Sequence, residues 1–241
     1  MKRILVPTDF SKHAEEALKS AVQIAKKNGS EIFLLHLLEL PHQLHDAMTN
    51  GSSIPEVMLF IKKAHEKLQK IKEQPHLQGI TISTTVQFER AFDGILSFNK
   101  KNNIDLIVMG SSGSSGIEEM LIGSNTEKVV RLSDIPVLVV KKDLDTFNIK
   151  NIVFASDFTK EIKKPFLKMI EFANIFDANL ALVMICTPNS FKTTAIAEKT
   201  MKDFIADFEV KNYSINIYNE KKKKKGIRNF TNTIGADLIG L

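Results

Sequence analysis

The chain repeats its own sequence, and this repeat constrains the fold more than any other feature. Residues 2–40 align with residues 150–188 at one constant offset and without a gap. The two openings, KRILVPTDFSK and KNIVFASDFTK, share their apolar, aspartate, phenylalanine and lysine positions. Self-similarity over such a length indicates one structural unit that occurs twice.

A second match follows at a shorter offset, which places residues 94–107 over residues 226–239. The first copy therefore has a longer segment between its two matched parts. We expect one domain at residues 1–142 and a second at residues 149–241, joined by a linker near residues 141–149.

Apolar runs alternate with helical periodicity along the first copy, which predicts an α/β fold with a parallel sheet and right-handed crossovers. The runs lack polar alternation, as buried parallel strands require. The predicted strands are residues 3–6, 31–38, 80–87, 104–109 and 137–140. The predicted helices are residues 14–28, 54–73, 91–100 and 124–132.

The second copy follows the same pattern up to Leu241, which aligns with Met109. The counterparts of the last loop, helix and strand of the first copy are missing from it. An apolar edge strand is usually covered in natural proteins. We therefore expect the natural chain to continue for one more loop, helix and strand.

Charge and cysteine content exclude several classes of function. The net charge of +5 comes from one run of five lysines at residues 221–225, and the other basic residues equal the 28 acidic residues in number. Nucleic acid is therefore an improbable partner. We interpret the run as a solvated loop before a helix starting at Gly226, with an acidic partner or phosphate as the alternative.

The single cysteine, Cys186, excludes an internal disulfide framework and a cysteine-based zinc site. The longest apolar runs are too short to cross a membrane, and the N-terminus lacks the core of a signal peptide. We expect a reducing, cytoplasmic location and no membrane partner.

A glycine- and serine-rich segment after the predicted strand 104–109 carries the strongest functional signal. Gly110 and Gly113 allow the backbone to approach a ligand closely. Ser124 and Glu127 fit an S-x-x-E capping box at the start of the next helix. Free N–H groups and the dipole at such a helix end favour an anion. Asp9 follows the first strand and should face the same crevice at the carboxyl ends of the strands.

The spacing Gly110-x2-Gly113-x9-Gly123-Ser124 resembles the nucleotide-binding signature of the universal stress protein family. The opening ILVPTD, the His36-Leu37 pair in the second strand and the final run at residues 135–140 are similar to that family as well. The resemblance covers nearly the whole chain as a tandem protein, with the second copy ending at its fourth strand.

The resemblance implies two Rossmann-like units of the adenine nucleotide α-hydrolase-like type, each with strand order 3-2-1-4-5. The second unit would lack its last helix and strand in this sequence. The strand at residues 137–140 would be a dimer edge, used either between two chains or by the two copies as a pseudo-dimer.

The resemblance also implies that the first copy binds ATP or AMP, with Mg²⁺ as a companion of the phosphates, and regulates stress adaptation through conformation or an unknown protein partner. The implied site residues are Pro7, Thr8 and Asp9 beside the adenosine, Leu37 and Met109 at the adenine, and Gly110, Gly113, Gly123, Ser124, Asn125 and Thr126 at the ribose and phosphates. Ser112 and Asn125 depart from the family pattern, where a histidine and a small apolar residue are usual.

No lysine or arginine lies between Gly110 and Ser124, and Glu118 and Glu119 are acidic. The G-x-x-x-x-G-K-[ST] phosphate loop is absent as well. A transferring phosphoryl group would then lack a cationic partner. We therefore expect an ATP-binding sensor with slow hydrolysis at most, one competent site per chain, and no set of catalytic residues.

Other interpretations stay open at this point. The glycines could serve only a turn in a protein-interaction module, and a slow nucleotide hydrolase is the third alternative. Asp9 could cap the first helix, as could Ser11. We expect His36 to be structural, Cys186 to be an inert buried thiol, and His42 and His45 not to bind a metal.

Overall fold

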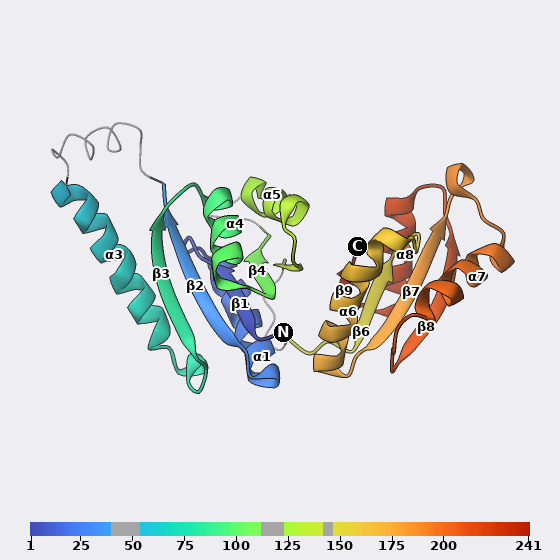
Figure 1. The fold of residues 1–241 in the computed structure, drawn as a ribbon, viewed down its shortest axis with the longest axis horizontal. Helices are drawn as coiled ribbons and strands as arrows, with labels where there is room; N and C mark the ends of the chain where they lie inside the picture. Colours follow the sequence, from blue (N-terminus) through green and yellow to red (C-terminus); the bar gives the residue numbers. More distant parts are fainter. Residues whose placement is uncertain (40–53, 112–122, 142–146) are drawn as a thin grey trace. The chain divides into compact units, whose positions relative to one another are not determined.

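The computed structural model describes residues 1–39, 54–111, 123–141 and 147–241 (Figure 1). The chain divides into two compact units, Met1–Phe147 and Asn148–Leu241. Both are α/β units in which strands and helices alternate along the chain.

The first unit contains a five-stranded parallel sheet in the order β3-β2-β1-β4-β5. This confirms the predicted order 3-2-1-4-5. The strands are β1 (Arg3–Pro7), β2 (Glu31–Leu38), β3 (Ile82–Phe88), β4 (Leu106–Gly110) and β5 (Val137–Val140). The helices are α1 (Lys12–Asn28), α3 (Ile54–Lys72), α4 (Ala91–Asn102) and α5 (Ser124–Leu132), with a 3-10 turn at Pro75–Leu77.

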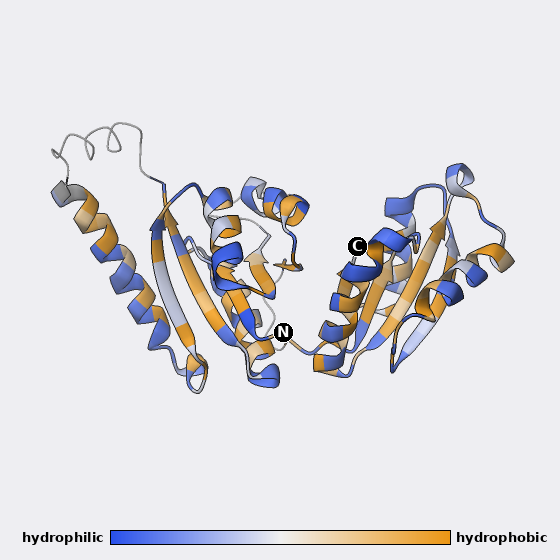
Figure 2. Cartoon of the chain, viewed as in Figure 1, coloured by the Kyte–Doolittle hydropathy of each residue, from blue (hydrophilic) through white to orange (hydrophobic). Residues whose placement is uncertain are grey.

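Hydrophobic residues run along the inner strands, and hydrophilic residues cover the outer sides of the helices (Figure 2). Helices α4 and α5 pack on the sheet through a cluster of buried residues, and α1 packs against β1 and β4. The cluster comprises Leu5, Leu35, Ile95, Phe98, Ile104, Ile107, Met109 and Val129. Its strand members alternate with residues of the opposite face, as in a sheet covered on both sides.

The second unit has a four-stranded parallel sheet in the order β8-β7-β6-β9, which matches the first four strands of the first unit. The α/β fold class is therefore confirmed. The strands are β6 (Asn151–Ala155), β7 (Asn179–Cys186), β8 (Tyr213–Asn219) and β9 (Leu238–Gly240). The helices are α6 (Lys163–Phe176), α7 (Thr194–Ile205) and α8 (Lys223–Ile234), with 3-10 turns at Lys160–Ile162 and Pro188–Ser190.

Several predicted boundaries were wrong by two or three residues. Strands β3 and β4 begin at Ile82 and Leu106, two residues later than expected. Helix α4 continues to Asn102 because Asn103 ends it in a left-handed conformation, with φ of 50°. Helix α8 begins at Lys223, three residues earlier than expected, so the last three lysines of the run are helical. The first two lysines precede the helix, and all five lysines are exposed, as predicted.

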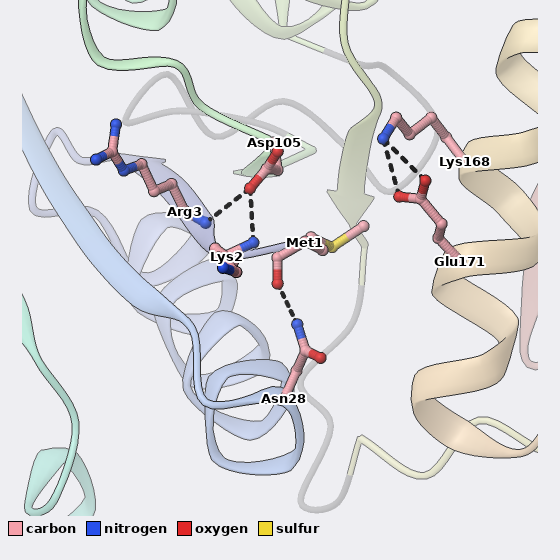
Figure 3. Close-up of polar contacts among 7 residues, drawn as sticks. All are labelled: Met1, Lys2, Arg3, Asn28, Asp105, Lys168 and Glu171. Carbon is pink, nitrogen blue, oxygen red and sulfur yellow. Dashed lines mark hydrogen bonds and ion pairs between the residues drawn. The ribbon is translucent and has the colours of Figure 1, made fainter.

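The repeat extends to individual hydrogen bonds. Figure 3 shows the Asp105 carboxylate accepting from the backbone N–H groups of Lys2 and Arg3, at 2.6 and 3.0 Å. In the second unit, Asp237 accepts from the backbone N–H groups of Lys150 and Asn151 at 2.8 and 2.9 Å. Each aspartate precedes the fourth strand of its unit and holds the start of the first strand beside it.

Candidate functional site

The order of the first sheet brings the described residues of the predicted site to the carboxyl ends of its strands. Strand β1 lies between β2 and β4, with β2 and β3 on one side and β4 and β5 on the other, so the direction of the strand order reverses beside β1. Ligands of open α/β sheets bind outside the carboxyl ends of the strands at such a switch point. The ends of β1, β2 and β4 meet there, and each of them carries predicted site residues.

The loop after β1 is held by its own side chains. Pro7 ends β1, and the N–H of buried Thr8 donates to Leu35 O at 2.8 Å. The Thr8 hydroxyl accepts from the Phe10 N–H at 3.1 Å, where the backbone adopts a left-handed φ of 63°. This turn leaves Asp9 exposed at the edge of the sheet.

Asp9 does not cap α1. Its Oδ1 accepts from the Ser11 N–H at 2.9 Å, and the Ser11 hydroxyl accepts from the Ala14 N–H at 3.2 Å. Ser11 is therefore the N-cap of the helix. Asp9 orients the capping residue, and its exposed carboxylate stays at the carboxyl edge of the sheet.

His36 fixes the same loop from the side of β2. Its Nδ1 donates to the Thr8 carbonyl at 2.8 Å, and its ring lies 4.3 Å from that of Phe10. The Lys67 ammonium lies 4.8 Å from the Phe10 ring centroid. Burial lowers the pKa of His36, and the nearby Lys67 adds to this, while the bond to Thr8 opposes it. His36 thus acts as a neutral structural donor.

Gly110 and Thr126 make internal contacts. A Cβ at Gly110 would lie 2.7 Å from the carbonyl oxygen of His13 in α1, so the close approach of β4 to α1 requires glycine. The buried Thr126 hydroxyl donates to Gly110 O at 3.0 Å and ties α5 to the end of β4. Met109 belongs to the core cluster, and Leu37 packs against that cluster. Packing therefore accounts for these four residues, and none of them lines the cavity beside α5.

Helix α5 begins differently from the prediction. Gly123 is its N-cap, with φ −58° and ψ 146°, and it supplies no side-chain hydrogen bond. Ser124 is the first helical residue, so the predicted Ser124–Glu127 capping box is wrong. The residue with extended backbone that precedes the helix is Gly123, one residue before the serine that the S-x-x-E pattern predicted as the cap. The Gly123 N–H donates to Ser111 O at 2.6 Å, which anchors the start of α5 to the end of β4.

A cavity of about 630 Å³ lies beside the start of α5. Its lining comes from the end of β2, the start of α4 and from α5, namely Glu39, Arg90, Phe92, Asp93, Ser124, Asn125, Lys128 and Leu132. Ser124 and Asn125 are exposed there. The first N–H groups of a helix have no intrahelical acceptor. This cavity can therefore offer backbone donors and two cations to an anion.

Sequence reasoning missed Arg90 and Lys128 because it searched for cations only between Gly110 and Ser124. Lys128 follows Ser124 by four residues, and this spacing on a helix could have indicated it. Nothing local could have indicated Arg90, which precedes α4 in the chain. Only the packing of α4 beside α5 brings it to the cavity.

Some predicted features lie outside the described residues. These are Gly113, Ser112, Glu118 and Glu119 in the glycine-rich segment, and His42 and His45 before α3. Among the residues that the structure does describe, no group of three or more histidine, cysteine or acidic side chains could hold a metal ion. Within the same residues, no helix has the length and apolar character needed to cross a membrane.

Residues 1–141 match the model of the universal stress protein family. The chain belongs to the universal stress protein family. A universal stress protein of Methanocaldococcus jannaschii is 34% identical over 142 residues, which cover 58% of this chain and 82% of the relative. Universal stress protein YxiE of Bacillus subtilis is 32% identical over 145 residues, which cover 58% of this chain and 98% of the relative.

The crystal structure of a universal stress protein from Archaeoglobus fulgidus superimposes with a TM-score of 0.75 and 22% sequence identity. The superposition covers 98% of this chain and 85% of the Archaeoglobus chain. At this identity the similarity establishes the fold, and it does so across both units of the stress protein.

Proposed function

We propose that the first unit of this stress protein binds ATP at the carboxyl ends of β1, β2 and β4. In this proposal, the bound nucleotide regulates stress adaptation by changing the conformation of the chain or its choice of protein partner. The observation that carries the proposal is the start of α5, which has no side-chain cap and borders a cavity with Ser124 and Asn125. A phosphate group is the natural acceptor for such a helix end.

The residues of the first unit fit the parts of a nucleotide. Asp9 would accept from the ribose hydroxyls, while Pro7, Thr8, Leu37 and Met109 would border the adenosine. Gly110 and Thr126 keep β4 and α5 together and would thereby position the phosphate donors. The N–H groups of Ser124 and Asn125 would donate to the phosphates, together with Gly113, while Gly123, whose own N–H donates to Ser111 O, would border them. Bound ATP supplies the negative charge that these donors neutralise, with Mg²⁺ as its counterion.

Titration calorimetry of the nucleotide-stripped chain with Mg-ATP tests the proposal. Gly123→Val should abolish binding because the valine side chain obstructs the approach to the first turn of α5. The extended backbone at Gly123 is one that valine adopts, so the unit should still fold. Arg131→Val, in the last turn of the same helix, is the matched control and should bind normally.

Saturable binding of close to one ATP per chain, lost in Gly123→Val only, would establish the site. Absence of heat and of any thermal shift at millimolar ATP would favour a protein-interaction module instead. The contacts of Gly110 and Thr126 favour that second candidate, because packing alone accounts for both residues. Phosphate release that is lost in Asp9→Ala would indicate the third alternative, a nucleotide hydrolase.

The assembly and the location of the protein are further parts of the proposal. Strand β5 is an edge of the first sheet with three half-buried apolar residues, and we propose it as the dimer edge, between chains or within a pseudo-dimer. We also propose a cytoplasmic location, supported by the single cysteine. One nucleotide site per chain, in residues 1–142, and a second domain at residues 149–241 complete the proposal.

A further inference from the structure

Two cations from different helices line the cavity beside α5. Arg90 is the N-cap of α4, and its side chain makes no capping hydrogen bond. Lys128 lies on α5, and both side chains belong to exposed residues. Within residues 1–39, 54–111 and 123–141, neither residue forms an ion pair with an acidic side chain. Neither charge is therefore held in an ion pair by a described residue, and each can attract an anionic ligand that enters the cavity.

The two helix starts at this cavity differ in how their donors are satisfied. At α4, the Glu39 carboxylate accepts from the Ala91 N–H at 2.8 Å, and Asp93 lies in the first turn. At α5, the cap is a glycine without a side-chain acceptor. Both acidic residues of the lining thus lie at the start of α4, where Glu39, which follows β2, caps the helix and Asp93 is part of its first turn. An incoming anion is best placed at α5, between its first turn and the two cations.

We propose that Arg90 and Lys128 bind the distal phosphates of a nucleoside triphosphate, so that the site prefers ATP to AMP. This inference rests on the proposed function. A single phosphate can be satisfied by the first turn of α5, whereas two more phosphates add charge that backbone donors alone do not neutralise. Arginine can bind such a group with two parallel hydrogen bonds, and lysine acts as a point charge. The two residues would therefore make the site bind a nucleoside triphosphate more tightly than a monophosphate.

The test compares ATP and AMP binding by calorimetry in the full chain. Arg90→Glu/Lys128→Glu should weaken ATP binding about tenfold or more and change AMP binding by less than about twofold. Arg90→Gln/Lys128→Gln should also weaken ATP binding, but by a smaller factor, because it removes the two positive charges without adding negative ones. The control Lys101→Glu/Arg131→Glu reverses two exposed charges in the last turns of the same two helices, outside the cavity. It should leave both affinities unchanged.

The outcomes separate this inference from the function on which it rests. If the parent chain binds both nucleotides and the double variant loses neither, or loses both equally, the role of the two cations is wrong while nucleotide binding stands. If the parent chain binds no nucleotide, the proposed function fails and this inference fails with it. Rising salt should also reduce the ratio of ATP to AMP affinity in the parent chain more than in the double variant.

Discussion

The two units build the loop after their first strand in the same way. Phe10 and Phe158 both adopt a left-handed backbone, with φ of 63° and 58°. The N–H of each donates to a hydroxyl two residues earlier, that of Thr8 in the first unit and that of Ser156 in the second. This shared turn belongs to the fold and is no mark of a nucleotide site.

The surroundings of that turn differ between the units. In the first, His36 donates to the loop and its ring packs against that of Phe10. In the second, Met184 aligns with His36, and Phe158 joins a group of packed phenylalanine rings. Beside this turn the first unit thus has a histidine that donates to the loop, whereas the second has packed, buried phenylalanine rings. The repeat therefore preserves the fold, while the residues around the loop differ between the two units.

The largest effect is expected from Phe166→Ala in the second unit. The Phe166 ring is fully buried and lies 5.0 to 5.1 Å from the rings of Phe154, Phe204 and Phe208. Its loss should lower the free energy of unfolding of this unit by about 3–5 kcal/mol. Native-state hydrogen exchange, followed at backbone amides of each unit separately, measures the free energy of unfolding of each unit. Leu167→Ala, at an exposed neighbour, is the control, and an equal loss in the first unit would show that the units do not unfold independently.

A smaller loss, confined to the first unit, is expected from Gly110→Ala. The new Cβ would meet the His13 backbone, which cannot move without shifting α1, at a cost of about 1–3 kcal/mol. Ser111→Ala, the next residue, adds no such contact and should be nearly neutral. Thermal unfolding resolved by unit measures both variants. If Gly110→Ala leaves the thermal stability of the first unit unchanged, packing is not the reason for a glycine at this position, and contact with a ligand would explain it instead.

The order of the elements was predictable because buried parallel strands and amphipathic helices leave different periods in the sequence. Their ends were less predictable, since they depend on single backbone conformations such as the left-handed Asn103 and the extended Gly123. The candidate site was predictable as a place, at the carboxyl edge of the sheet. The cation Arg90 was not, because the packing of α4 against α5 is not encoded in any local pattern.

The paired aspartates offer a finer comparison of the units. Asp105→Ala and Asp237→Ala each remove an acceptor of two backbone N–H groups. Each should destabilise its own unit by about 1–2 kcal/mol. Asp134→Ala, at an exposed position of the first unit, is the control. Chemical denaturation followed unit by unit measures the losses, and clearly unequal values would show that the repeat is not equivalent at these bonds.

The smallest effect concerns pH. Burial lowers the pKa of His36 below its value of 6.5 in the unfolded chain, so the folded state resists protonation. The contribution of neutral His36 to the free energy of unfolding is therefore complete above pH 6.5. It is lost as the pH falls toward the pKa of His36 in the folded state. Replacing His36 with methionine, as at the aligned position of the second unit, should flatten this dependence in the first unit. A residual slope should remain, because burial also lowers the pKa of His76.

Thermal unfolding of the first unit between about pH 7.5 and pH 5 measures that slope around the ordinary histidine pKa. The second unit is the internal control, because it contains no histidine. An unchanged slope in the His36→Met variant would contradict a neutral structural role for this side chain.

The most direct test of the central claim is hydrogen exchange of the full chain with and without saturating Mg-ATP. We predict slower exchange at residues 8–13 and 123–128 of the first unit. We predict no change at residues 156–161, which follow the first strand of the second unit. Protection at the equivalent loops of both units, or at neither, would contradict the claim that the first unit alone holds the nucleotide.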